Sequence, residues 1–271
     1  MNKVLMQRKF QLEKLKKYLL HDLSFLDISC IKVFGSATNE ELFDNVNSDI
    51  DIIAYTDYVN YQNILNTIKS IEMVGGNYID KRPIFIKDFI NARIEYFYEI
   101  DGVPFDINIF PNKIWGYEDI SDTVLHDALD VFFGGMNQYA ETIYGSFQPL
   151  NEISNEVYPF YNTTIREKRL KMLESRISTI VSKIKSKIKN NDRDVFEYIL
   201  KSRGYVIKWL FIESQVYPID IYKHLNYQLS NMLSLNEEEI DSLLLLNSNN
   251  INDIIEKYLN FIEGKVLVKK I

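Results

Sequence analysis

Two aspartates stand in an apolar stretch, where a carboxylate has to be explained. Asp49 and Asp51 lie two residues apart in residues 49–55, which have the β-branched, apolar character of a strand. Alternate side chains of a strand point to the same side, so the two carboxylates share one face, roughly 7 Å apart. Carboxylates at that spacing share a divalent cation when another group fills the gap. Mg²⁺ is the expected cation because it prefers oxygen ligands.

Asp106 is the candidate third carboxylate. It lies in residues 103–110, where the odd-numbered positions are apolar and share one face, while Asp106 and Asn108 take the other. A charge inside so apolar a strand is costly unless it is paired or functional. Placed on a strand next to that of Asp49 and Asp51, it completes a cluster of three carboxylates.

Gly35 and Ser36 directly follow a predicted strand at residues 28–34. A glycine lets the backbone approach a phosphate closely, and the serine hydroxyl and nearby amides can bond phosphate oxygens. The order is a strand, Gly-Ser, a loop, a strand with two aspartates, and then an aspartate on a later strand. This order predicts a phosphate-binding turn beside a metal site, which transfer of a phosphate-bearing group requires.

The secondary-structure elements that must position these residues show different sequence patterns in the two parts of the chain. In the first part, helical periodicity at 4–23 and 58–73 is mixed with strand patterns at 28–34, 49–55, 93–100 and 103–110, the last two joined by a turn at Asp101-Gly102. Beyond about residue 120 the strand signal fades, and helices are predicted at 121–133, from Arg166 onward, and at 194–215, 218–233, 237–246 and 251–263. We therefore predict an α+β protein, with an N-terminal mixed-sheet domain over 1–115 and an all-helical C-terminal domain over 116–271.

The motif residues resemble the nucleotidyltransferase superfamily that includes polymerase beta and the antibiotic nucleotidyltransferases. The matching stretches are Phe34-Gly35-Ser36, Ser48-Asp49-Ile50-Asp51-Ile52 and Phe105-Asp106-Ile107. The resemblance covers about residues 20–112 through these motifs. It extends more loosely to the whole chain, since antibiotic-modifying members also carry a helical C-terminal domain. One departure is that twelve residues separate Ser36 from Asp49, more than expected for the family.

The resemblance implies an enzyme that moves a nucleoside monophosphate from ATP, or another nucleoside triphosphate, to an acceptor hydroxyl with Mg²⁺, in a two-metal site. Asp49 and Asp51 would hold Mg²⁺ against the triphosphate, and Gly35 and Ser36 would bind its β- and γ-phosphates. Asp106 would bind a second metal or act as general base toward the acceptor hydroxyl, and the sequence does not separate these two roles.

The function is open between three classes, of which the first two differ in the acceptor. The first is a small molecule of the aminoglycoside or lincosamide type, which would make the chain an antibiotic-resistance enzyme. The second is a protein or RNA, as in the nucleotidyltransferases of toxin–antitoxin systems. The third reading is a non-catalytic nucleotide-binding module. Oligomeric state is also open, and a homodimer is one arrangement to test because some antibiotic-modifying relatives build the site across a dimer.

Charge separates the two halves of the chain. The net charge is −7, and residues 1–150 carry 13 Lys and Arg against 22 Asp and Glu, which argues against binding of long nucleic acid. Residues 166–193 differ, with ten basic against three acidic side chains. This stretch is either a solvated helix surface or a face that contacts a triphosphate or another polyanion.

Cellular location is predicted from what the chain lacks. Residues 2–23 are charged and helix-like without the apolar segment of a signal peptide, and no run of about eighteen apolar residues occurs. The single cysteine, Cys30, lies in a predicted strand and is expected to be a buried thiol. We therefore expect a cytoplasmic protein without a membrane partner.

Overall fold

The fold was analysed in a computed structural model of the chain. The structure describes residues 3–43, 48–56, 76–78, 84–87, 92–111, 135, 138–146, 160–190, 194–220, 223–246 and 250–267. The chain divides into two compact units, Met1–Pro159 with Ile219–Ile221, and Phe160–Pro218 with Tyr222–Ile271. The first unit contains a mixed sheet and the second consists of helices, so the predicted α+β class is confirmed.

The sheet of the first unit runs in the order β3-β5-β6-β2-β1-β7, and β4 also pairs with β5. Its strands are β1 (Ile28–Phe34), β2 (Ile50–Thr56), β3 (Gly76–Tyr78), β4 (Ile84–Lys87), β5 (Ala92–Ile100), β6 (Val103–Pro111) and β7 (Glu141–Gly145). Among the described pairings β2 and β6 run parallel and all others antiparallel. The strands predicted for β1, β2, β5 and β6 are therefore confirmed to within a residue or two.

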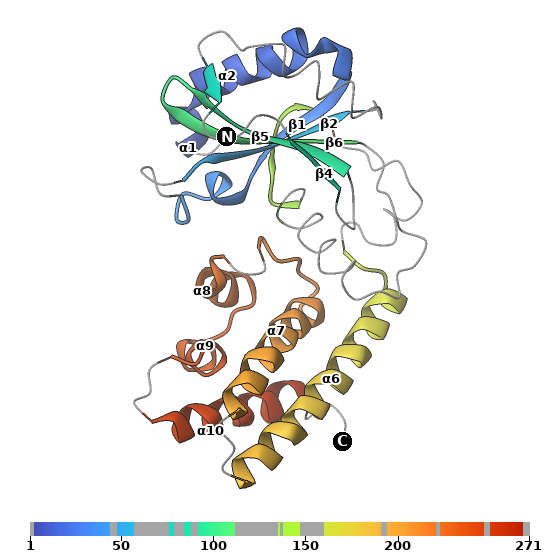
Figure 1. The fold of residues 1–271 in the computed structure, drawn as a ribbon, viewed down its shortest axis with the longest axis vertical. Helices are drawn as coiled ribbons and strands as arrows, with labels where there is room; N and C mark the ends of the chain where they lie inside the picture. The colour runs from blue at the N-terminus through green and yellow to red at the C-terminus, as the bar shows by residue number, and fades with distance from the viewer. Residues whose placement is uncertain are drawn as a thin grey trace. The chain divides into compact units, whose positions relative to one another are not determined.

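One face of the sheet is covered by the N-terminal helices (Figure 1). Instead of one helix over 4–23, the chain forms α1 (Lys3–Gln7) and α2 (Lys9–Lys17), separated at Arg8, and then a π-helical turn over Tyr18–Asp22. The core between helices and sheet contains alternate residues of the strands, including Val33 of β1 and Ile52 of β2. Because side chains alternate along a strand, Phe34 and Asp51 belong to the opposite face.

The hairpin that carries β6 is the one expected from the sequence. Asp101 and Gly102 join β5 to β6, with φ angles of +51° and +78°. Two consecutive positive φ angles are typical of the two-residue turns that suit the twist of a hairpin. This turn fixes the register in which β6 lies beside β5.

The last strand of the sheet was not predicted. β7 (Glu141–Gly145) pairs antiparallel with β1, and Gly145, with φ +63°, packs so closely that a Cβ would lie 1.9 Å from the carbonyl oxygen of Ser29. A domain boundary between residues 115 and 116 stays a prediction, and the first compact unit of the structure extends past that point to include β7. Two predicted helices, at 58–73 and 121–133, lie outside the described residues.

The second unit is built from α6 (Thr163–Lys189), α7 (Val195–Glu213), α8 (Leu225–Tyr227), α9 (Glu237–Leu244) and α10 (Ile251–Ile262). Asparagine side chains cap the N-termini of three of them, and Asn236 forms a capping box with Glu239. The helix predicted over 218–233 is wrong in its first part. Residues 218–220 are not helical, and the helix begins at Leu225, after His224 with φ +56°.

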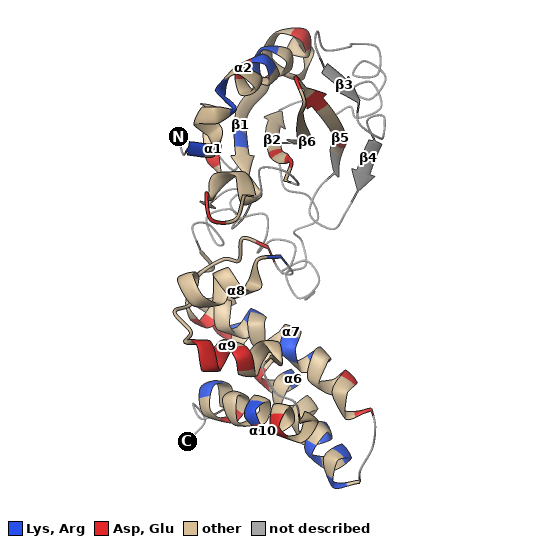
Figure 2. Cartoon of the chain, turned by 90° about the vertical axis from the view of Figure 1, so that its left-hand side faces the viewer, with Lys and Arg blue, Asp and Glu red and all other residues tan. Residues whose placement is uncertain are grey.

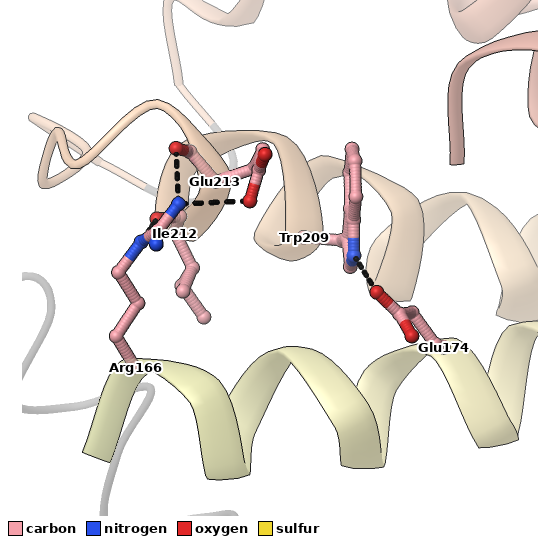
Figure 3. A network of polar contacts seen from close by, with 5 residues as sticks. All are labelled: Arg166, Glu174, Trp209, Ile212 and Glu213. Atoms are coloured by element: carbon pink, nitrogen blue, oxygen red, sulfur yellow. Dashed lines mark hydrogen bonds and ion pairs between the residues drawn. The ribbon is translucent and has the colours of Figure 1, made fainter. Parts of the chain in front are cut away.

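Polar contacts fasten α6 to α7 (Figure 3). Arg166 Nε donates to the carbonyl oxygen of Ile212 at 3.1 Å, and its Nη2 donates to the Glu213 carbonyl and to Glu213 Oε2, both at 2.8 Å. The indole Nε1 of Trp209 donates to Glu174 Oε1 at 3.3 Å. Arg166 therefore adds hydrogen bonds to the last carbonyl groups of α7, of which that of Ile212 also accepts from the Gln215 amide at 3.2 Å.

No helix in the described part of the chain has both the length and the apolar content that crossing a bilayer needs.

Candidate metal centre

Asp51 and Asp106 lie directly opposite each other on neighbouring strands. β2 and β6 pair in parallel, and their register matches Asp51 with Asp106. Both residues alternate with the buried Ile50, Ile52 and Phe105, so they project from the face that the N-terminal helices do not cover. The parallel pairing thus brings together two carboxylates that lie 55 positions apart in the chain.

Asp49 joins them from the residue just before β2. Ligand oxygens of Asp49, Asp51 and Asp106 all lie within 4.8 Å of one another, and each side chain is partly exposed. The structure therefore brings together the three predicted carboxylates. Three carboxylates this close repel one another in the absence of a cation, and oxygen ligands with room for water are what Mg²⁺ takes. The donor set thus fits a divalent cation held by Asp49, Asp51 and Asp106.

Gly35 packs against this cluster. Phe34, the last residue of β1, pairs with Asp51, so the chain leaves β1 beside the Asp51 carboxylate. Gly35 has φ +69°, and a Cβ built on it would lie 2.2 Å from Asp51 Oδ2. Only a residue without a side chain fits here, both for its backbone angle and for the space. Gly35 therefore has a role that the sequence did not predict: its lack of a side chain leaves the space that the Asp51 carboxylate occupies.

Ser36 follows in the short 3₁₀ turn Gly35–Thr38. The hydroxyl of Thr38 donates to the Gly35 carbonyl oxygen at 2.8 Å, and the amide of Asn39 donates to the Ser36 carbonyl oxygen at 3.0 Å. Ser36 itself is partly exposed and directly follows Gly35, which packs against Asp51. Its predicted contact with phosphate stays a prediction.

Asn108 is a site residue whose role the sequence analysis missed. Its Nδ2 donates to Asp106 Oδ1 at 3.0 Å, and its side chain is 4% exposed. The two residues are i and i+2 on β6 and so share a face, which is the sequence signal that could have found the contact. A buried amide that bonds one carboxylate oxygen restricts the rotation of that carboxylate, so Asn108 orients Asp106.

The same face of β1 carries a buried lysine. Lys32 lies two residues before Phe34, is 6% exposed, and stands next to Cys30 along that face. Burial lowers the pKa of the Lys32 ammonium, and the electrostatic influence of Cys30 partly offsets that shift. Burial also raises the pKa of the Cys30 thiol, with Lys32 opposing the shift, which agrees with the expected buried thiol.

Comparison with known proteins finds similar solved structures but no matching protein family. No family model and no curated protein matches the chain. One similar solved structure is a nucleotidyltransferase-like protein from Exiguobacterium sibiricum 255-15, with 10% identity, a TM-score of 0.44, and coverage of 94% of this chain and 74% of that chain. Another is the GLD-2/RNP-8 complex, with 13% identity, a TM-score of 0.30, and coverage of 98% and 80%. TM-scores this low show nothing about the function of this chain. The functional conclusion depends on the geometry of the carboxylate cluster instead.

Proposed function

We propose that the chain is a nucleotidyltransferase that uses a divalent cation, Mg²⁺, to move a nucleoside monophosphate from a nucleoside triphosphate to an acceptor hydroxyl. The observation that carries the proposal is the convergence of Asp49, Asp51 and Asp106 within 4.8 Å, beside the turn that begins at Gly35. The motif resemblance supports the same reaction. Mg²⁺ bound there would neutralise phosphate oxygens and the charge that develops on the leaving pyrophosphate.

The residues of the chain divide the remaining work. Asp49 and Asp51 would hold the cation. Gly35 and Ser36 would bind the β- and γ-phosphates, which is supported by the pairing of Phe34, just before the turn, with Asp51. The acceptor oxygen forms a bond to the α-phosphorus as the bond from that phosphorus to the bridging oxygen breaks, and pyrophosphate leaves. Asp106, oriented by Asn108, takes the proton of the acceptor hydroxyl or binds a second cation.

For the donor we propose ATP, and for the acceptor a small molecule with several hydroxyl groups. Net charge supports a cationic acceptor of the aminoglycoside type, since residues 1–150 carry 13 basic against 22 acidic side chains. An acidic surface raises the local concentration of a cationic substrate. A lincosamide-like acceptor is the neighbouring alternative, and protein or RNA acceptors are the second class.

The test is transfer by the purified full chain. Protein, Mg²⁺ and each of the four triphosphates are incubated with a panel of aminoglycosides and lincosamides, and mass spectrometry searches for an acceptor heavier by one nucleoside monophosphate. Asp51→Asn is expected to abolish the product and to keep the fold, because it relieves repulsion among the carboxylates. Asp101→Asn is the matched control, since it makes the same change in an exposed hairpin turn.

The outcomes separate the alternatives. A modified antibiotic that Asp51→Asn fails to make supports the proposal and names the acceptor. Magnesium-dependent nucleotide binding without any product moves the search to protein and RNA acceptors, which the same mass measurement on the protein itself and on added RNA detects. Full activity of Asp51→Asn, or no nucleotide binding by the wild type, contradicts the proposed site.

A further inference from the structure

Strand β5 carries three side chains that the proposed reaction has not used. Tyr98 and Ile100 of this strand are buried in the core under the N-terminal helices. Because side chains alternate along a strand, Glu95, Phe97 and Glu99 project from the opposite face. All three are partly exposed. They therefore share a face with the carboxylate cluster and are accessible on it.

The register of the sheet places these side chains next to the cluster. Phe97 pairs with Asp106, and Glu95 and Glu99 are the next residues of the same face on either side of Phe97. Cβ atoms of directly paired residues lie about 4.5–5.5 Å apart, and those of diagonal neighbours about 7–8 Å, which a long side chain can span. Among the described residues, neither glutamate belongs to the group of carboxylates that converge within 4.8 Å. Both can therefore contact a molecule that lies over Asp106 without serving as ligands of the cation.

The order of the strands gives the side from which the acceptor approaches. The sheet contains β1, β2, β6 and β5 in that order, from left to right in Figure 2. In the proposed reaction pyrophosphate leaves toward the turn that follows β1, and the cation is held at Asp51 of β2 and Asp106 of β6. In an in-line displacement the attacking oxygen enters opposite the leaving oxygen. The acceptor therefore lies over β6 and β5, which are about 4.8 Å apart.

We propose that Glu95, Phe97 and Glu99 form the acceptor-binding surface of the site and select an acceptor that carries ammonium groups near its reacting hydroxyl. This inference rests on the proposed nucleotidyl transfer. Carboxylates accept charge-assisted hydrogen bonds from ammonium groups, and the face of a phenyl ring attracts a cation. A phenyl ring between two carboxylates therefore suits a small polyhydroxylated amine, and its place beside Asp106 brings a hydroxyl of that amine to the reacting phosphate.

The same surface disfavours an acceptor that carries phosphate. Glu95 and Glu99 add negative charge on the side from which the acceptor approaches, and like charges within a few ångströms repel each other. An RNA acceptor would bring the phosphate next to its terminal ribose to this surface. The two glutamates therefore favour a small amine over RNA, because they attract the first and repel the second.

The test uses the full chain with Mg²⁺ and α,β-methylene-ATP, whose methylene bridge prevents transfer. Isothermal titration calorimetry first measures binding of this nucleotide and then binding of two probes to the loaded protein. The first probe is neamine, a small amino sugar with several ammonium groups. The second is fully N-acetylated neamine, which keeps the hydroxyl groups and loses the positive charges.

Four variants separate the charges from the ring. Glu95→Gln/Glu99→Gln removes both charges and keeps the size of the side chains. Glu13→Gln/Asp22→Asn is the matched control, since it removes two charges at exposed positions of the helical segments that cover the other face of the sheet. Phe97→Leu removes the ring, and Phe97→Tyr keeps it. Circular dichroism checks that each variant is folded.

We expect the wild type to bind neamine at least about tenfold more tightly than its N-acetylated form. Glu95→Gln/Glu99→Gln should lose at least about tenfold in affinity for neamine, and the control less than about twofold. Phe97→Leu should lose about threefold or more, because the ring no longer attracts the cation, whereas Phe97→Tyr should bind neamine as the wild type does.

The outcomes distinguish this inference from the function on which it rests. Absence of magnesium-dependent nucleotide binding by the wild type would contradict the proposed function, and this inference with it. Nucleotide binding without neamine binding, or equal affinity for the two probes, would overturn the amine acceptor alone. Equal losses of neamine affinity in the glutamine variant and its control would mean that overall charge attracts the amine. An equal loss of nucleotide and neamine affinity in the glutamine variant would assign the glutamates to the nucleotide instead.

Discussion

Replacing Gly35 by alanine adds one carbon atom where the turn meets the carboxylate cluster. A Cβ at this position would lie 2.2 Å from Asp51 Oδ2 and 3.2 Å from Asp51 Cγ. Comfortable contact between non-bonded heavy atoms begins at about 3.5 Å, so the carboxylate oxygen must move by roughly 1 Å. Asp51 has a short side chain on a paired strand, so this movement takes its carboxylate away from Asp49 and Asp106.

Two separate effects follow from this substitution. The first is a loss of stability, because φ at Gly35 is +69° and an L-residue in that region costs about 1–2 kcal/mol. The second is a loss of function, because a displacement of about 1 Å in a catalytic group can reduce the rate about 100-fold. We therefore expect a moderate fall in the free energy of unfolding and a large fall in metal-dependent nucleotide binding and turnover.

Gly102 offers a control that separates the two effects. It has φ +78°, and a Cβ there would have no atom within 4 Å. Gly102→Ala therefore carries a similar backbone cost without touching the cluster. The difference between the two variants measures the displacement of Asp51 alone.

The assay compares both variants with the wild type by urea denaturation, by calorimetric titration of Mn²⁺ in the presence of ATP, and by nucleotide transfer once an acceptor is known. Gly35→Ala should resemble Gly102→Ala in stability to within about 1 kcal/mol, since both carry the same backbone cost, and fall far below it in Mn²⁺ affinity. Equal Mn²⁺ affinity in the two folded variants would refute the reasoning, since Asp51 would then not need the position that the glycine allows.

Three further substitutions test other parts of the chain. Asn108→Ala removes the hydrogen bond to Asp106, and a hydrogen bond to a charged group is worth about 1.5–3 kcal/mol. Mn²⁺ affinity, measured by titration calorimetry, should therefore fall about tenfold. Unchanged affinity would contradict the orienting role of Asn108. Burial raises the pKa of Tyr258, so this tyrosine ionises first in the unfolded chain, and the free energy of unfolding should fall as pH rises above about 10. In urea titrations at several pH values, Tyr258→Phe should show a smaller fall than the wild type. An equal fall in the two proteins would contradict the prediction. Arg166→Met should lower the free energy of unfolding, measured by urea denaturation, by about 1–3 kcal/mol. Lys14→Met, which removes an exposed ion pair, should lower it by less than about 1 kcal/mol. Equal losses of stability in the two variants would show that the contacts of Arg166 with α7 do not stabilise the fold.

The sequence predicted the parts of the fold that depend on local patterns. β1 was predicted with its observed bounds, Ile28–Phe34, because a run of buried β-branched residues ends at a glycine. The three carboxylates were found because a charge inside an apolar strand is costly and therefore noticeable. That β2 lies parallel to β6, with Asp51 opposite Asp106, depends on contacts between distant residues, for which the sequence carries no local signal.

The elements that were missed lack such a pattern. β7 lies at the end of the sheet and pairs only with β1 among the described strands, and its residues are all at least partly exposed, so no alternation of apolar residues marks it. The helix expected at 218–233 has apolar residues at helical spacing. The left-handed backbone of His224, with φ +56°, interrupts it, and histidine gives no warning of this as glycine would.

The register between β1 and β2 explains how the site tolerates a long loop. Twelve residues separate Ser36 from Asp49, yet the turn lies beside the carboxylates because Phe34 pairs with Asp51. Doubling the length of a loop costs only about 0.6 kcal/mol in closure entropy, whereas a shift of one residue in the register would turn Asp51 into the core and Ile52 out of it. The antiparallel pairing therefore sets the position of Gly35 against Asp51, and the length of the intervening loop is free to vary without moving either.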